Sequence, residues 1–313
     1  MDETRHTELG RLLLRCLTRP GLLPPADLAG LELDEPTIEE LTALANHHRV
    51  PGVVYAALRA AGLDDDQLLD LRHAYQMATL AHARCLVELA ATRAALADAA
   101  VPWIVVKGPV LVELGYRDPG SRLYEDLDVV VAPRSLSAAI AALEETGGRV
   151  VDLDWRKMSS SRRAEIPMVL GNGLLCDLHW SLLITGDARA RFDLSVDELM
   201  ERRRPVRLGG VDVHTLDVTD GLLYLCLHGS LSGGHQLVWT KDLSEMIMSE
   251  PVDWDELVRR ARRWRADLVA AVQLERAREL LHTDIPDGLV NSLARGRPWW
   301  RFWRLRERRA GVA

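Results

Sequence analysis

The sequence contains little cysteine and little lysine. Its 313 residues include four cysteines, Cys16, Cys85, Cys176 and Cys226, which lie far apart and form no Cys-x-x-Cys pair. This spacing excludes a disulfide framework and a cysteine-rich zinc site, so we expect small buried thiols. Lysine occurs only at positions 107, 157 and 241 among 39 basic residues. Since nearly all other basic residues are arginine, Lys107 stands out.

Long hydrophobic runs are also missing. No apolar run approaches the roughly 18–20 residues of a membrane helix, and the N-terminal MDETRHTELGRLLLRC lacks the basic, apolar and small-residue order of a secretory signal. The composition, 48% hydrophobic and 27% charged, is typical of a soluble globular protein. We therefore expect a cytoplasmic protein with no membrane partner.

The chain as a whole has no excess of positive charge. Its formal net charge is −7, which argues against general nucleic-acid binding, so we do not expect nucleic acid as a partner. Basic residues gather only in the last fifth. There Trp299, Trp300, Phe302 and Trp303 lie beside arginines; they can stack on a nucleobase or pack the last helix onto the body, and we favour packing.

The hydrophobic periodicity divides the chain into three parts. Apolar residues recur every three or four positions up to about residue 99 and again after 219, which predicts helices. Between them, short apolar runs alternate with turns, which predicts strands and one helix. The expected strands are WIVV (103–106), LDVVV (127–131), GRVVDLDW (148–155), EIPMVL (165–170) and LLCDLHW (174–180), and the helix is SLSAAIAALEETGG (135–148). A tight Gly-Asn-Gly turn is expected to join the last two strands. We predict an α+β fold with an N-terminal helical region (1–99), a small mixed-sheet core (100–210) and a C-terminal helical domain (211–313).

Two aspartates, Asp126 and Asp128, stand at the mouth of the strand LDVVV. Residues two apart on an extended strand face the same side, roughly 6.5–7 Å from each other. Like charges so placed are stabilised by a shared proton or by a divalent cation. A solvated pair of acids is the alternative, and Asp-x-Asp alone does not decide between the two interpretations.

A third acid, Asp177, favours the interpretation that the carboxylates bind a divalent cation. The run LLCDLHW places Asp177 and His179 on one face of a predicted strand and apolar residues on the other. A carboxylate on a buried strand is costly unless it is paired or binds a metal. Three converging carboxylates therefore predict a magnesium site, with manganese as the alternative.

Lys107 and Gly108 follow the first predicted strand and precede a predicted helical turn. Free backbone N–H groups at a helix start, a glycine that allows close approach and an ammonium group are the ingredients of a phosphate site. The Lys-Gly pair alone is weak evidence for a phosphate site. The evidence becomes stronger because Asp-x-Asp and then Asp177 follow the pair along the chain.

Together these motifs resemble the nucleotidyltransferase superfamily with the DNA polymerase β-like fold, and within it the bacterial group of nucleotidyltransferase family proteins. The resemblance rests on Lys107-Gly108, Arg122, Asp126-Leu127-Asp128 and Asp177-Leu178-His179-Trp180. It extends to HHRVPGVVYAAL, LCLHGSLSGGHQLVWTKDLSEM and VDWDELVRRARRW, and so covers most of the chain. The wider superfamily has Gly-Gly or Gly-Ser where this chain has Lys107-Gly108, so we infer that Lys107 substitutes as a phosphate ligand.

The resemblance implies a nucleotidyltransferase core and an enzyme that transfers a nucleoside monophosphate from a nucleoside triphosphate to an acceptor, with release of pyrophosphate. ATP is the default donor, and the acceptor is an unidentified small molecule, peptide or protein. By the same resemblance, Asp126, Asp128 and Asp177 are catalytic and hold Mg²⁺, with Asp177 as either ligand or general base. Lys107, Gly108 and Arg122 would bind the phosphates.

Four other residues are candidates for the acceptor pocket or for orienting the carboxylates: His179, His228, His235 and Asp242. Each also has a structural interpretation, such as a satisfied core histidine for His179 and a solvated pair with Lys241 for Asp242. Two alternative functions remain, an inactive relative that binds nucleotide or a partner, and a toxin-like nucleotidyltransferase acting on tRNA. The presence of all three acids favours the active enzyme.

Overall fold

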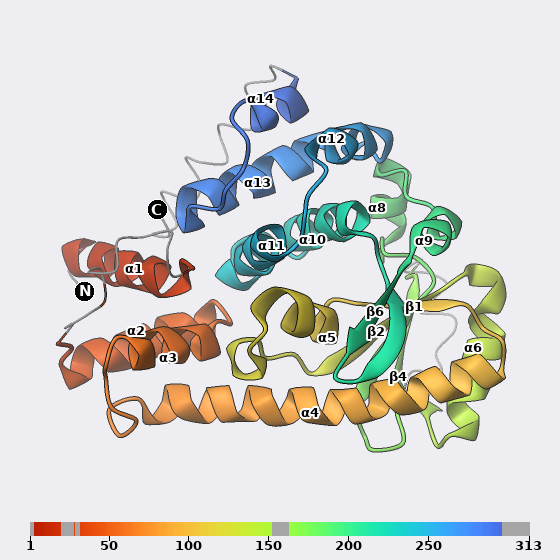
Figure 1. Ribbon diagram of the computed structural model, residues 1–313, viewed down its shortest axis with the longest axis horizontal. Helices are drawn as coiled ribbons and strands as arrows, with labels where there is room; N and C mark the ends of the chain where they lie inside the picture. Colours follow the sequence, from red (N-terminus) through yellow and green to blue (C-terminus); the bar gives the residue numbers. More distant parts are fainter. Residues whose placement is uncertain (1–2, 20–27, 29–31, 152–162, 296–313) are drawn as a thin grey trace.

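The computed structural model describes residues 3–19, 28, 32–151 and 163–295 (Figure 1). Helices precede and follow a central sheet along the chain, which confirms the predicted α+β class. The C-terminal aromatic residues 299–303, and the second half (152–155) of the strand expected at 148–155, lie outside the described residues.

In the N-terminal part, the described residues form the helices α1 (Glu3–Leu17), α2 (Glu35–His47), α3 (Pro51–Ala60) and α4 (Leu69–Asp98). Their starts are encoded locally. The side chain of Asp34 accepts a hydrogen bond from the backbone N–H of Thr37 at 3.1 Å and so caps α2. Pro51 begins α3, where a missing N–H costs nothing. Pro36 and Pro51 thus lie in the first turns of α2 and α3.

A mixed five-stranded sheet forms the centre, with the order β1-β2-β5-β4-β3. Its strands are β1 (Trp103–Val106), β2 (Asp126–Val131), β3 (Arg149–Val150), β4 (Glu165–Val169) and β5 (Leu175–His179). β2 pairs in parallel with β5, whereas the other pairs are antiparallel. The turn around Gly-Asn-Gly joins β4 to β5 as predicted, closed by a hydrogen bond from Leu170 N to Leu174 O at 2.8 Å.

Each strand sends alternate side chains to opposite faces of the sheet. Leu127, Val129 and Val131 pack on α4 and on α6 (Leu136–Glu145), while Val130 faces the C-terminal helices. Figure 1 shows α4 beneath the sheet and the C-terminal helices above it. Because Asp126 and Asp128 alternate with the residues that face α4, they share the C-terminal-helix face with Val130.

The connection from β1 to β2 is compact. α5 (Gly108–Val110) continues directly into the π-helical segment η2 (Leu111–Tyr116), and the 3₁₀ turn η3 (Pro119–Ser121) leads toward β2. A second 3₁₀ turn, η4 (Pro133–Ser135), follows β2 and opens α6. This compact connection places Lys107, which follows β1, close to Asp128 near the start of β2.

A two-stranded hairpin, β6 (Arg204–Leu208) and β7 (Val211–Thr215), was not predicted. The Thr215 hydroxyl donates a hydrogen bond to the Val105 carbonyl at 2.7 Å, which fastens the hairpin beside β1. Its signal was present in the sequence as Gly209-Gly210 between two runs with apolar alternation. The expected boundary at residue 210 falls within this turn.

The C-terminal part is helical, as the period predicted. Its helices are α10 (Val218–Leu231), α11 (Leu237–Ser249), α12 (Trp254–Arg263), α13 (Asp267–Leu281) and α14 (Leu289–Ala294). Two shorter helices, α8 (Gly186–Arg191) and α9 (Val196–Arg202), lie within the predicted core and were not predicted. Asp217 caps α10 through the N–H of Asp220 at 2.7 Å. Within the described ranges, no helix has the length and apolar character needed to cross a bilayer.

The two helical parts share a hydrophobic cluster. Leu41 and Val54 of the N-terminal helices are buried with Leu237 of α11 and Leu281 of α13. In addition, α4 belongs to the predicted N-terminal region but covers the lower face of the sheet. The three-part division stays a prediction, and the parts are tied together by these shared cores. All four cysteines are buried and free, as expected.

The turn η3 is wedged between α3 and α4. A Cβ added at Gly52 of α3 would lie 2.0 Å from the carbonyl oxygen of Gly120, and one added at Gly120 would lie 2.3 Å from the ring of Tyr75. Tyr75 also donates a hydrogen bond to Asp118 at 2.7 Å. The N-terminal helices thus hold the segment that leads into β2 and its aspartates.

Replacing Gly52 by alanine should destabilise the protein by about 1–3 kcal/mol, because the methyl group meets rigid backbone. Urea denaturation monitored by tryptophan fluorescence measures this change. Gly221→Ala is the matched control, since its nearest neighbour would be 3.9 Å away, and it should be neutral or stabilising. Equal changes in unfolding free energy at the two glycines would contradict the close packing of α3 against the turn η3.

Candidate active site

Five ionisable side chains lie on the sheet face that looks toward the C-terminal helices. They come from three neighbouring strands: Asp126, Asp128, Glu165, Asp177 and His179. Their strand neighbours on the opposite face belong to the apolar core against α4 and α6. Strict alternation of side chains therefore gathers the polar groups on one side.

The pairing register brings these groups level with one another. Asp128 of β2 is the register partner of Asp177 on the parallel strand β5. Glu165 of β4 is the register partner of His179 on β5. The predicted convergence of Asp128 and Asp177 follows from this arrangement, and His179 joins them.

Asp128 is the centre of the group. Its side chain is only 2% exposed, and its Oδ1 lies 2.6 Å from the ammonium of Lys107 and 2.9 Å from Nε2 of His179. Burial by itself would raise the pKa of the Asp128 carboxyl, but Lys107 and the hydrogen bond from His179 outweigh burial and hold it well below its usual range. Asp128 is therefore ionised and fully paired.

His179 connects two carboxylates. Its Nε2 contacts Asp128, and its Nδ1, buried and without a hydrogen-bond partner, lies 3.6 Å from Oε2 of Glu165. That distance is too long for a hydrogen bond but close enough for electrostatic attraction. Arg163 forms an ion pair with Glu165 on its other side. His179 is thus a buried histidine with a hydrogen bond to Asp128, and its role in orienting the carboxylates stays a prediction.

Asp177 and Asp126 have raised carboxyl pKa values. Burial, with Asp128 close by and His179 opposing, raises the pKa of Asp177 to about 6. Burial and the charge of Asp128 also raise the pKa of Asp126, with Lys107 opposing. A carboxyl group that titrates near neutrality on a face shared with other acids is typical of a catalytic site.

Three of these residues could hold a metal ion. One ligand atom each from Asp128, Asp177 and His179 lie within 4.8 Å of one another. Carboxylate oxygens suit Mg²⁺ and Mn²⁺, and the imidazole nitrogen shifts the preference toward transition metals such as Mn²⁺. Asp126, which we predicted as a ligand, lies outside this group of three, and its role as a ligand stays a prediction.

Lys107 has an unusual backbone. Its φ of 52° and ψ of −129° lie outside the helical and extended regions, and such a conformation costs a non-glycine residue about 1–3 kcal/mol. Gly108, which follows, is buried, and a Cβ there would lie 2.8 Å from the ring of Tyr124. A glycine at this position would avoid the strain, so the ion pair of Lys107 with Asp128 is maintained against a backbone cost.

Arg122 and Asp242 form a buried ion pair. Arg122 donates from Nε to Oδ1 at 2.8 Å and from Nη2 to Oδ2 at 3.0 Å, and Tyr116 donates to the same carboxylate at 2.8 Å. The pair joins the segment before β2 to α11. Asp242 and Lys241 are both buried and Lys241 pairs with Glu245, so the interpretation of 241–242 as a solvated pair is wrong.

The two other candidate histidines differ in exposure, since His228 is half-buried and His235 is exposed. Burial and the nearby charge of Lys107 lower the pKa of His228 to about 3, with Asp128 opposing, which places its ring within electrostatic range of the site. His235 is exposed, and its ring is 5.7 Å from that of Trp239. The charges of Lys107 and Asp128 act on His228, and both histidine rings contact Trp239, at 6.3 Å between ring centroids for His228 and 5.7 Å for His235.

Sequence reasoning missed two neighbours of the group. Glu165 could have been found by counting back from the predicted Gly-Asn-Gly turn, because an antiparallel hairpin pairs it with His179. Tyr224, buried on α10, interacts with Lys107, and burial raises the pKa of its phenol to about 12. No sequence signal distinguishes Tyr224 from the apolar residues around it.

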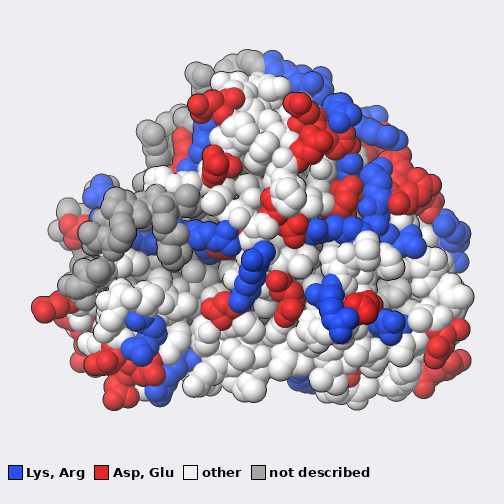
Figure 2. Space-filling model, viewed as in Figure 1, with Lys and Arg blue, Asp and Glu red and all other residues white. Residues whose placement is uncertain are grey.

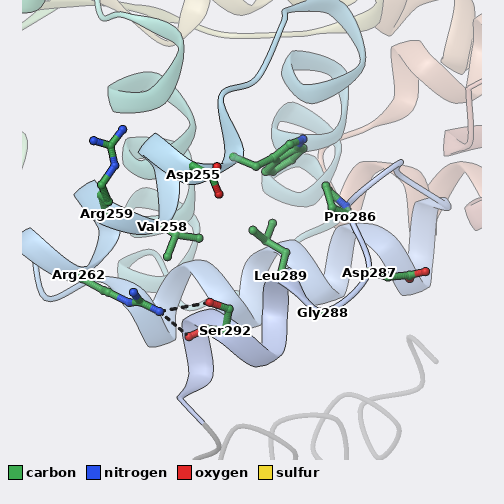
Figure 3. Close-up of a pocket in the computed structure, with 10 residues that line it drawn as sticks. Asp255, Val258, Arg259, Arg262, Pro286, Asp287, Gly288, Leu289 and Ser292 are labelled. Carbon is green, nitrogen blue, oxygen red and sulfur yellow. Dashed lines mark hydrogen bonds between the residues drawn. The ribbon is translucent and has the colours of Figure 1, made fainter.

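Two surface features lie apart from the carboxylates. An open pocket of about 640 Å³ is formed by α12, α14 and the segment before α14, where Arg262 donates hydrogen bonds to Ser292 (Figure 3). It includes none of the five ionisable residues of the sheet face. On the face shown in Figure 2, basic and acidic side chains are interspersed, so the charge there does not form a single basic patch.

Comparison with known proteins identifies a family. Residues 34–282 match the sequence model of a family described as "uncharacterised nucleotidyltransferase", which confirms the resemblance. No curated protein matches the chain. Two solved structures of ANT(2")-Ia are similar at 14% identity: a crystal structure in complex with adenylyl-2"-tobramycin (TM-score 0.38, 59% of this chain and 94% of that chain) and a solution structure of the same antibiotic-resistance factor (TM-score 0.32, 70% and 93%).

Replacing Asp177 by asparagine should stabilise the metal-free protein at pH 8 and have little effect at pH 4. The folded carboxyl has a pKa of about 6 against an ordinary 3.8, so its neutral form favours folding below pH 4 and this contribution is lost as pH rises through 6. Asparagine imitates the neutral form. After allowance for screening, the gain at pH 8 is on the order of 1–2 kcal/mol. Urea denaturation with a chelator, with exposed Asp197→Asn as control, tests it; equal effects at both pH values would refute it.

Removing one partner of the Arg122–Asp242 pair should cost about 3–5 kcal/mol of unfolding free energy, because the other charge stays buried. The double variant Arg122→Met/Asp242→Leu should lose clearly less than the sum of the two single losses. Chemical denaturation of all four proteins measures this coupling. The exposed pair Arg207–Asp212, at 3.2 Å, is the matched control, and its coupling should stay below about 1 kcal/mol.

Proposed function

Because the chain belongs to the family described as uncharacterised nucleotidyltransferases, we propose that it transfers a nucleoside monophosphate from a nucleoside triphosphate to an acceptor hydroxyl and releases pyrophosphate. The donor is taken as ATP, and the acceptor as a small molecule, a peptide or a protein. The observation that carries the proposal is the convergence of Asp128, Asp177 and Lys107 on one sheet face.

The donor set of Asp128, Asp177 and His179 fits a divalent cation. Two carboxylates and an imidazole are accepted ligands of Mn²⁺, and the carboxylates suit Mg²⁺. The buried Nδ1 of His179, facing Glu165, matches the common arrangement in which a carboxylate orients a ligand histidine. When bound, the cation supplies neutralisation of phosphate charge and lowers the pKa of the acceptor hydroxyl.

The chain's own residues divide the remaining work. In the alternative in which Asp177 is the general base instead of a metal ligand, its carboxyl, with a pKa of about 6, is ionised above neutrality and accepts the proton of the acceptor hydroxyl. Lys107 supplies positive charge toward the phosphates, and the glycine beside it permits close approach of the backbone. Arg122 has its guanidinium committed to Asp242, so we assign it to positioning the segment that enters β2.

The reaction forms one bond and breaks one. The acceptor oxygen bonds to the α-phosphorus while the bond from that phosphorus to the bridging oxygen breaks, and pyrophosphate leaves. In the alternative in which Asp177 is the general base, the hydroxyl proton passes to it. His228, neutral because burial lowers its pKa to about 3, and Tyr224 lie on α10 above this face, and we assign them to the wall of the acceptor pocket.

Thermal denaturation with each of the four nucleoside triphosphates, with and without Mg²⁺ or Mn²⁺, tests the proposal. One triphosphate at about 100 times its dissociation constant should stabilise the wild type by roughly 2.7 kcal/mol. The variant Asp126→Asn/Asp128→Asn should lose this shift, and Asp197→Asn, whose side chain is 57% exposed, should keep it. Failure of every triphosphate to shift the wild type with either metal would overturn the proposal.

Transfer itself is measured with triphosphates labelled at the α-phosphate and candidate acceptors of the three classes. Asp128→Asn should lower the transfer rate by about a hundredfold or more, because its partner Lys107 and the neighbouring ligands lose their anchor. Label left in nucleoside diphosphate instead of on the acceptor would show that the bond between the β- and γ-phosphates is the one that breaks.

A further inference from the structure

One contact in the active site is not explained by phosphate binding. The ammonium of Lys107 lies 2.6 Å from Oδ1 of Asp128, and Nε2 of His179 lies 2.9 Å from the same oxygen. A carboxylate oxygen has about two lone-pair positions. Lys107 and His179 together occupy both, so a cation that binds at this oxygen must displace one of them.

Binding of the cation at the other carboxylate oxygen of Asp128 would not remove the competition with Lys107. A divalent cation there would lie within a few ångströms of the ammonium, and like charges repel strongly at a buried site. The side chains of Asp128 and Lys107 are 2% and 15% exposed, so solvent screens this repulsion little. Metal binding and the Lys107–Asp128 ion pair therefore oppose each other.

We infer that Lys107 is an internal cation that neutralises Asp128 in the nucleotide-free protein and moves to the triphosphate when the metal takes its place. The inference rests on the proposed function and deepens it. A lysine suits this exchange, because its ammonium is a compact charge on a flexible stem with three donors. Triphosphate oxygens supply the negative charge that the ammonium gives up at Asp128.

The sequence and backbone of this position agree with the exchange. Lys107 keeps a positive φ of 52° where glycine would be unstrained. A phosphate ligand alone could be placed elsewhere, whereas a group that must reach both Asp128 and the phosphates has to stand at the end of β1. His179, the other partner of Asp128, remains beside Glu165 and is thus held for the metal.

The consequence is coupled binding. Free of nucleotide, the protein binds metal weakly, because the ammonium competes for Asp128. With a triphosphate present, Lys107 has a new partner and the metal binds more tightly; by linkage, metal strengthens triphosphate binding by the same factor. This coupling prevents the site from holding metal without its substrate.

The test uses Lys107→Met, which keeps the length of the side chain and removes its charge. Two affinities are measured at pH 7.5, that for Mn²⁺ alone by electron paramagnetic resonance of free Mn²⁺, and that for α,β-methylene-ATP at saturating Mn²⁺ by calorimetry. We expect the variant to bind Mn²⁺ about tenfold more tightly and the nucleotide analogue about tenfold less tightly. Opposite shifts are diagnostic, since a lysine needed only for structure would weaken both.

Two further variants keep the result interpretable. Lys107→Gly removes the charge and the backbone strain together, and should show the same opposite shifts if Lys107→Met folds poorly. Lys241→Met removes the other described lysine, which is also buried but pairs with Glu245, and both affinities should stay within about twofold.

The outcomes separate the two hypotheses. If wild type binds Mn²⁺ and the analogue but Lys107→Met and Lys107→Gly leave Mn²⁺ affinity unchanged or lower it, the internal-cation role is wrong and the nucleotidyltransferase proposal stands. If wild type binds neither Mn²⁺ nor any triphosphate analogue, including those of CTP, GTP and UTP, both are wrong. Loss of Mn²⁺ binding in Asp128→Asn confirms that the measured site is this one.

Discussion

The structure depends on one constraint, the burial of the Asp128 carboxylate at the centre of a sheet. A buried charge is stable only if other groups compensate it, and Asp128 is compensated by Lys107 at 2.6 Å and His179 at 2.9 Å. Those partners come from the ends of β1 and β5, the strands on either side of β2. The need to pair this charge therefore specifies which strands must flank β2 and where each must end.

Helices on both sides of the sheet position the segments that carry Asp128 and its partner Lys107. α3 and α4 clamp the turn η3, which sets where the chain enters β2. Above the sheet, α11 receives Arg122 through Asp242, and α10 places Tyr224 near Lys107. The sheet face with the carboxylates is thus enclosed by segments that are distant in sequence, and helical segments before and after the core both build its surroundings.

Local patterns predicted much of this molecule. The strands at 103–106 and 165–169, the turn between β4 and β5, and the helical parts on either side followed from periodicity and from turn residues, because neighbouring residues set both. The motif order led to the family that the chain belongs to. The interpretation of Asp242 and Lys241 as a solvated pair failed because burial depends on remote packing. Arg122 becomes the neighbour of Asp242 only when α11 packs against the segment before β2, and Lys241 is buried together with Glu245 of the same helix.

The sequence by itself determined that Asp126 and Asp128 share a face, that Asp177 and His179 share another, and that a lysine stands at the end of β1, because a strand alternates its side chains with a period of two. Only the tertiary structure decided that these faces are the same face. The parallel pairing of β2 with β5 sets Asp128 level with Asp177, and this pairing joins residues about fifty positions apart through backbone hydrogen bonds that carry no side-chain signature. The same packing paired Lys107 with Asp128, which no local pattern encodes.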